Sequence, residues 1–129
     1  MENEIDILKL DRTMDDVIEI LRTFFTLILA GDTAYSVVKN TRPKEQKITF
    51  QIRYTDWTDF ARRMLLTVLP QAKVTEKKIT FDFNTIPIEI LIVKKDKFIK
   101  TPDTVIYNFE SYWIPNPFDA YWKARGLMI

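Results

Sequence analysis

Two carboxylates in the middle of the chain have side-chain types and a spacing that could support chemistry. Asp82 and Glu89 lie in two runs that alternate apolar and polar residues on either side of Asn84 and Thr85, a pattern typical of a β-hairpin. A turn at Asn84 and Thr85 makes Asp82 and Glu89 diagonal neighbours on one face. Glu89 then needs a hydrogen bond, an ion pair, a metal ion or water, because a carboxylate is costly to bury in so apolar a strand.

The composition makes carboxylates the main candidates for chemistry. The 129 residues include no cysteine and no histidine, which excludes disulfides, thiol nucleophiles, His-based triads and His- or Cys-ligated metals. Only two glycines occur, and the sequence has neither a Walker loop nor a GxGxxG motif. Carboxylates remain as the strong metal ligands and general bases.

The hairpin over residues 78–94 predicts which side chains face the core. Phe81 should lie opposite Ile88, and Ile79 opposite Ile90, on the buried face. The second strand is so apolar that we expect it to be central in its sheet, with helices on at least one side.

Other segments predict the elements that position this hairpin. Residues 1–12 fit either a short strand or an irregular lead-in. Helical spacing of apolar residues predicts a helix from about Thr13 to Ala30, ending at Gly31 and Asp32. Residues 33–40 fit a short second helix or a strand, residues 41–46 a loop, and residues 48–54 a strand with one buried face.

A further helix should follow, capped by Thr55 or Thr58 and ending before Pro70. Its expected apolar positions are Phe60, Met64, Leu65 and Val68. We expect residues 71–77 to be a linker, 105–109 a short strand, 111–116 a rigid connection and 118–127 a C-terminal helix. The sequence therefore predicts a single domain over residues 1–129, of α/β (α+β) class, with a small mixed β-sheet covered by helices.

Charge is unevenly distributed, although the net charge is only +1. Residues 1–32 hold eight acidic and three basic side chains, whereas residues 39–78 hold ten basic and four acidic ones. A basic stretch of this kind suits a nucleotide or a nucleic acid, but is more often a solvated face. The start lacks the order of a signal peptide, and the longest apolar run is too short to span a bilayer. We therefore expect a cytoplasmic protein with no membrane partner.

Three segments occur in an order that resembles a known family. Residues 27–37, LILAGDTAYSV, contain Gly31 and Thr33 with Asp32 between them, residues 42–52 contain a predicted strand, and residues 86–93 contain Glu89. This order resembles the nucleotidyltransferase fold of the DNA polymerase β superfamily, especially its minimal members and the LicD/fukutin-like branch. In that family a Gly-Gly/Ser-Ser/Thr signature precedes an Asp-x-Asp strand and a later strand with a third carboxylate.

The resemblance implies a nucleotide-binding site and names its residues. They are Gly31, Asp32, Thr33, Lys47 and Thr49, with Glu89 as a metal ligand. Arg42 and Lys44, in the proline-containing loop, are further candidates for contact with a phosphate, although residues in such a loop are more often simply solvated. Lys47 and Thr49 stand where the two metal-binding aspartates of the family should be. Lysine does not bind Mg²⁺ and threonine is a weak neutral ligand, so the usual two-metal reaction lacks two of its three carboxylates. We predict that Glu89 instead pairs with Lys47, and that this ion pair replaces a former metal site.

Three functions remain open at this point. The preferred one is a catalytically degenerate nucleotidyltransferase-like protein, needing no cofactor, that acts as a binding or regulatory module for a protein partner or a nucleotide. Such a small chain would suit a phage or mobile element. The first alternative is an active nucleotidyltransferase that uses Asp82 and Glu89 with Mg²⁺. The second is a nucleic-acid-binding protein that uses the basic residues between 39 and 78. Dense aromatic residues near the end of the chain would form a partner surface if exposed: Tyr112, Trp113, Phe118, Tyr121 and Trp122.

Overall fold

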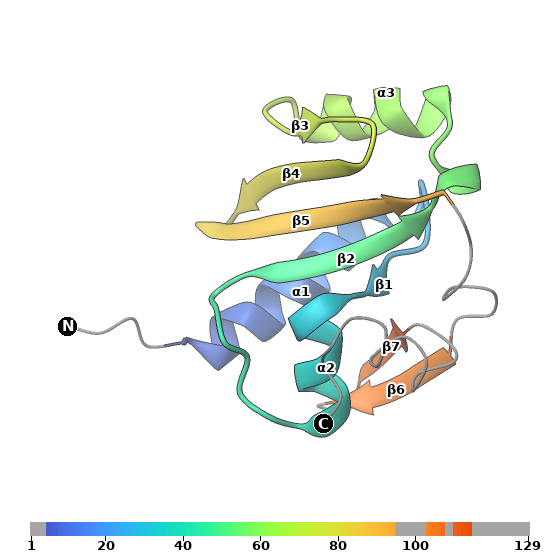
Figure 1. Cartoon of the computed structure of the whole chain (residues 1–129). Coiled ribbons are helices and arrows are strands. Elements are labelled where there is room, and N and C mark those ends of the chain that lie inside the picture. Colours follow the sequence, from blue (N-terminus) through green and yellow to red (C-terminus); the bar gives the residue numbers. More distant parts are fainter. Residues whose placement is uncertain (1–4, 95–102, 108–109, 115–129) are drawn as a thin grey trace.

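The computed structural model describes residues 5–94, 103–107 and 110–114, which form three α-helices, a five-stranded mixed sheet and a separate two-stranded hairpin (Figure 1). This architecture confirms the predicted α+β class with a small mixed sheet. In chain order the elements are α1 (Ile7–Leu21), β1 (Ile28–Leu29), α2 (Gly31–Lys39), β2 (Ile48–Arg53), a 3₁₀ turn (Tyr54–Asp56), α3 (Asp59–Val68), β3 (Lys73–Val74), β4 (Lys78–Phe83), β5 (Ile86–Val93), β6 (Asp103–Tyr107) and β7 (Glu110–Ile114).

The predicted hairpin forms the centre of the sheet, whose strand order is β1-β2-β5-β4-β3. β4 and β5 pair so that Phe81 lies opposite Ile88 and Ile79 opposite Ile90, as expected. β5 also pairs in parallel with β2. The central position of this apolar strand is therefore confirmed.

The turn between β4 and β5 requires positive φ angles at both central residues. Asn84 has φ 55° and Thr85 has φ 64°, which is the backbone twist that favours a two-residue hairpin. This conformation is common for asparagine but costly for a β-branched residue. Thr85 is held there by its hydroxyl, which donates to the carbonyl of Asn84 at 2.6 Å and accepts from Lys9 Nζ at 2.5 Å.

Figure 1 shows α1 behind the sheet, so that its apolar side covers one sheet face. The core on this face includes Leu21, Phe50, Ile79 and Ile90, each fully buried. Thr49, Glu89 and Thr80 alternate with these core residues and so project from the opposite face. This second face carries the candidate site.

The predicted bounds of the first helix were wrong at both ends. Asp6 caps α1 by accepting from the backbone N–H of Lys9 at 3.1 Å, and Thr13 is buried within the helix. The helix ends at Leu21 because Ile28 and Leu29 pair with Gln51 and Phe50 of β2 as strand β1. Tertiary strand pairing overrides the helical spacing of these apolar residues.

The predicted buried side of α3 was also partly wrong. Thr58 caps the helix as expected, accepting from Ala61 N at 3.1 Å. Leu65 is buried as predicted, together with Ala61, whereas Phe60 is 62% exposed and Val68 is 43% exposed.

Two connections were expected where short strands form. Part of the linker at 71–77 is β3, and most of the connection at 111–116 is β7, which pairs with β6. The helix expected at 118–127 lies outside the described residues. In the described ranges, no helix is both long and apolar enough to cross a bilayer.

Two tyrosines attach the β6–β7 hairpin to α1. Tyr112 is buried and its hydroxyl donates to Asp15, while the Tyr107 hydroxyl donates to Asp11 at 3.4 Å. Asp11 and Asp15 lie one helical turn apart, so they present acceptors on the same side of α1. Burial, together with the hydrogen bond to Asp15, raises the pKa of Tyr112 above the ordinary value of a phenol.

We predict that Tyr112→Phe lowers the free energy of unfolding by about 1 kcal/mol at pH 7, because one hydrogen bond is lost. In the native protein the raised pKa favours the protonated phenol, so this stabilisation is complete below about pH 10 and declines as the pH rises further. Urea denaturation between pH 7 and 11 should show a weaker alkaline decline in the variant. Trp113→Phe, at an exposed neighbouring position, is the control. If the free energy of unfolding of Tyr112→Phe declines above about pH 10 as steeply as that of wild type, the Tyr112 hydroxyl does not stabilise the fold in this way.

Candidate functional site

Glu89 lies between two lysines on the sheet face opposite α1. Its Oε1 atom is 3.3 Å from Lys47 Nζ, and its Oε2 atom is 3.2 Å from Lys78 Nζ. The Glu89 side chain is 18% exposed, whereas those of Lys47 and Lys78 are 39% and 49% exposed. The predicted Lys47–Glu89 ion pair is confirmed, although it is less buried than expected and is one half of a three-residue cluster.

Strand register brings these side chains together. Glu89 of β5 has Thr49 as its partner on β2 and Thr80 as its partner on β4. Lys47 and Lys78 each lie two residues before one of these threonines, so they project from the same sheet face. Sequence reasoning missed Lys78, although the predicted hairpin register already made it a diagonal neighbour of Glu89.

The two lysines determine the ionisation of Glu89. Burial acts to raise its pKa, but the hydrogen bond from Lys78 and the charge of Lys47 outweigh burial, and the pKa of Glu89 is lowered. The carboxylate is therefore ionised at neutral pH, and both of its oxygens have a cationic partner.

These residues do not fit a two-metal site. Asp82 is exposed on the same sheet face, opposite Pro87, and has no ion pair within the described chain. Among the described residues, no group of three or more carboxylates, histidines or cysteines is placed to hold a metal ion. Asp82 and Glu89 are thus on a common face without forming a metal-binding cluster.

The segment around Gly31 packs directly against Thr49. Gly31 begins α2 with φ +55°, a conformation that favours glycine. A Cβ atom there would lie 3.8 Å from Thr49 Cγ2. Thr33 Oγ1 accepts a hydrogen bond from the backbone N–H of Thr49 at 2.9 Å. Residues 27–37 and 42–52, two of the three segments that carry the resemblance, are therefore adjacent in space.

A hollow next to this contact gathers most of the predicted nucleotide-binding residues. It is lined by Asp32, Thr33, Lys44, Glu45, Lys47 and Thr49. Asp32 closes one side, because its Oδ2 atom accepts from the backbone N–H of Lys44 at 2.8 Å. Arg42 is not part of this lining. Its Nη1 atom donates to the carbonyl of Ile5 at 3.1 Å, which ties it to the segment before α1.

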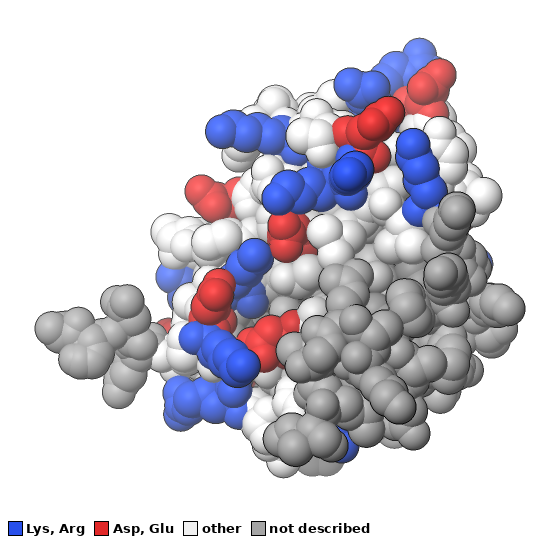
Figure 2. Space-filling model, viewed as in Figure 1, with Lys and Arg blue, Asp and Glu red and all other residues white. Residues whose placement is uncertain are grey.

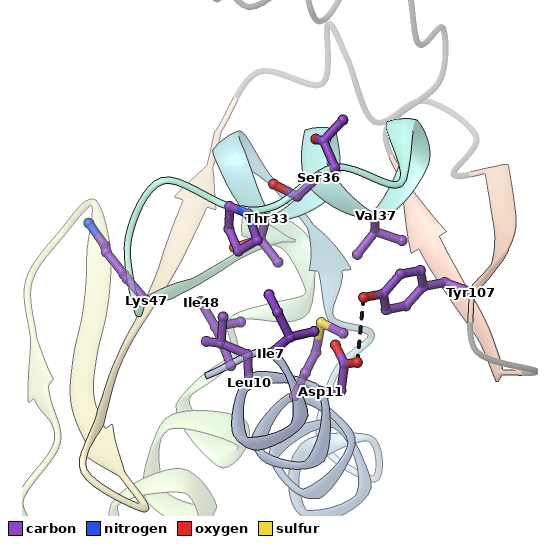
Figure 3. A pocket seen from close by; sticks show the side chains of 12 residues that line it. Ile7, Leu10, Asp11, Thr33, Ser36, Val37, Lys47, Ile48 and Tyr107 are labelled. Carbon is purple, nitrogen blue, oxygen red and sulfur yellow. Dashed lines mark hydrogen bonds between the residues drawn. The ribbon is translucent and has the colours of Figure 1, made fainter. Parts of the chain in front are cut away.

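Figure 3 shows a separate small cavity between α1 and α2, also lined by Lys47 and Thr33. Its volume is about 30 Å³, which is room for about one water molecule. The Ser36 hydroxyl lines the cavity and is buried without a hydrogen-bond partner among the residues that the structure describes. The Tyr107–Asp11 hydrogen bond lies across the cavity from Ser36 (Figure 3). This space is too small for a nucleotide.

Basic and acidic side chains are mixed on the face viewed in Figure 2. The basic residues between 39 and 78 are spread over several elements, from Lys39 on α2 through Arg62 and Arg63 on α3 to Lys73 and Lys78 on the strands. Carboxylates such as Glu89 and Asp82 lie among them. Around the hollow lined by Lys47, Lys73 and Lys78, the positive charge is therefore interrupted by Asp82 and Glu89.

No protein-family model matches the sequence, and no curated protein matches it either.

We predict that Glu89→Gln lowers the free energy of unfolding by up to about 1 kcal/mol at pH 7, because two partly exposed ion pairs are lost. Since the pKa of Glu89 is lowered in the folded protein, its contribution is present above about pH 4.3 and declines as the pH falls through the folded-state pKa. Urea denaturation between pH 3 and 7 should therefore show a weaker acid decline in the variant. Asp82→Asn removes a nearby carboxylate that has no ion pair with any described residue, and it is the control. If the free energy of unfolding of Glu89→Gln falls with acid as steeply as that of wild type, the ion pairs do not stabilise the fold.

Proposed function

We propose that the chain is a catalytically inactive, nucleotidyltransferase-like binding module that holds a nucleotide or a protein partner without a divalent metal ion. The observation that carries this proposal is the contact of Glu89 with both Lys47 and Lys78. In two-metal chemistry, carboxylates hold the ions that neutralise the phosphates and activate the attacking group. Here the carboxylate on β5 has two ammonium groups as partners.

The three segments that resemble the nucleotidyltransferase order, residues 27–37, 42–52 and 86–93, lie next to one another, which supports this proposal. Gly31 and Thr33 contact Thr49, and Thr49 lies opposite Glu89 in the parallel pairing of β2 with β5. Side chains at positions 47, 49 and 89 therefore share one sheet face, as metal ligands in this order would have to. The lysine and threonine at the first two positions remove the negative charge that a metal ion needs.

The enzymatic alternative requires a different set of ligands. It would use Asp82 and Glu89, but both oxygens of Glu89 have lysine partners, and no group of three or more potential metal ligands occurs among the described residues. The nucleic-acid alternative requires a continuous basic surface, whereas charges of both signs alternate on the face shown in Figure 2.

Restoring the missing carboxylates tests the proposal. We predict that wild type binds Mn²⁺ weakly at most, and that Lys47→Asp/Thr49→Asp binds Mn²⁺ at least about tenfold more tightly, because three carboxylates then converge. Isothermal titration with MnCl₂ measures both, and circular dichroism checks that each variant is folded. Adding Glu89→Gln to the double variant should remove the gain.

The opposite pattern would refute the proposal. It would consist of Mn²⁺ binding by wild type that is lost in Glu89→Gln, together with metal-dependent turnover of a nucleoside triphosphate.

A further inference from the structure

A broad hollow lies on the sheet face opposite α1, on the β3 side of Glu89. Three lysines, two carboxylates and a threonine line it, together with apolar and amide groups: Lys47, Lys73, Lys78, Asp82, Glu89 and Thr80. Its volume is about 680 Å³, which is within the range of small-molecule sites. It shares Lys47 with the hollow beside Gly31.

The strand pairings arrange these groups in a row. Lys73 of β3 lies opposite Thr80 of β4, and Thr80 lies opposite Glu89 of β5. Lys78 is two residues before Thr80 and is therefore a diagonal neighbour of Lys73 on the same face. Neighbouring strands are about 4.8 Å apart. The two ammonium groups can thus reach one ligand above the Thr80 hydroxyl.

The charge of the hollow is incompletely balanced. Glu89 contacts one ammonium group through each of its oxygens, but every ammonium has three N–H donors. Lys73 is exposed and has no ion pair within the described part of the chain. Three positive and two negative side chains leave an excess of one positive charge, and Asp82 stands exposed among them.

We infer that this hollow binds the phosphate group of a small phosphorylated ligand directly through lysines. This inference rests on the proposed metal-independent function, because without a divalent ion the phosphate charge must be neutralised by side chains. Lysine binds phosphate as a point charge and does not require the bidentate geometry of arginine. A nucleotide and an inorganic polyphosphate present the same group.

Glu89 acts as an internal competitor in this site. It occupies donors of Lys47 and Lys78 that a phosphate would otherwise use. Removing its charge should therefore strengthen phosphate binding. A metal-dependent site would show the opposite sign, because there Glu89 would hold the ion that recruits the phosphate.

Isothermal titration in EDTA at low salt tests this inference, with pyrophosphate and ATP as the two probes. Relative to wild type, we expect about threefold to fivefold tighter binding in Glu89→Gln and a similar weakening in Lys73→Gln and Lys78→Gln, as for partly exposed charge pairs. Arg63→Gln removes an exposed positive charge on α3 and should leave binding unchanged. Affinity should fall as NaCl is added. Equal affinity for both probes identifies the phosphate as the recognised group, whereas tighter ATP binding identifies a nucleotide.

Several results would overturn the inference. They are absence of binding by wild type, equal binding of sulfate at matched ionic strength, equal loss in Arg63→Gln, or weaker binding in a folded Glu89→Gln protein. Lys73→Gln changes an exposed side chain that has no ion pair with the described residues, so its effect can be measured even if Lys78→Gln fails to fold. Failure here would leave the gain of Mn²⁺ binding in Lys47→Asp/Thr49→Asp as a separate test of the proposed function.

Discussion

The parallel pairing of β2 with β5 is the constraint on which the other features depend. Its register runs from Ile48 opposite Ile88 to Arg53 opposite Val93. Because side chains alternate across a strand, this register sets both faces at once. One face presents isoleucines and Phe50 to α1, and the other places Thr49 beside Glu89. A slip of one residue would move Glu89 into the core and the isoleucines to the surface, so core packing and site geometry are selected together.

The cluster around Glu89 shows how an acidic residue is tolerated in an apolar strand. Its neighbours along β5, Ile88 and Ile90, are buried, and an unpaired carboxylate next to them would be costly. Lys47, just before β2, and Lys78, on β4, reach it from both sides and remain partly in solvent on their long side chains. This arrangement limits the desolvation of all three charges, and it keeps the ammonium groups accessible to a ligand.

The sequence was most informative where pairing is local. The β4–β5 hairpin, its turn and its register follow from alternation and from the turn residues, since both strands are close in the chain. The Lys47–Glu89 pair was also predicted, from the resemblance that places Lys47 where the family has a metal-binding aspartate. The end of α1 was not predicted, because Ile28 and Leu29 form a strand only through their pairing with β2, which is distant in the chain. Similarly, periodicity alone predicted Leu65 on the packed side of α3, but it missed Ala61 and wrongly included Phe60 and Val68.

The tyrosine contacts of the β6–β7 hairpin have a consequence for the order of folding. They join Asp11 to Tyr107 and Asp15 to Tyr112, which are 96 and 97 residues apart in the chain. Contacts this distant require closure of a long loop, whereas the β4–β5 turn joins neighbours. We therefore expect the central hairpin to form early and the outer hairpin to dock late. During synthesis, these two hydrogen bonds to α1 cannot both form until residues 107 and 112 have been added, so the first helix of the chain is completed by its last described strands.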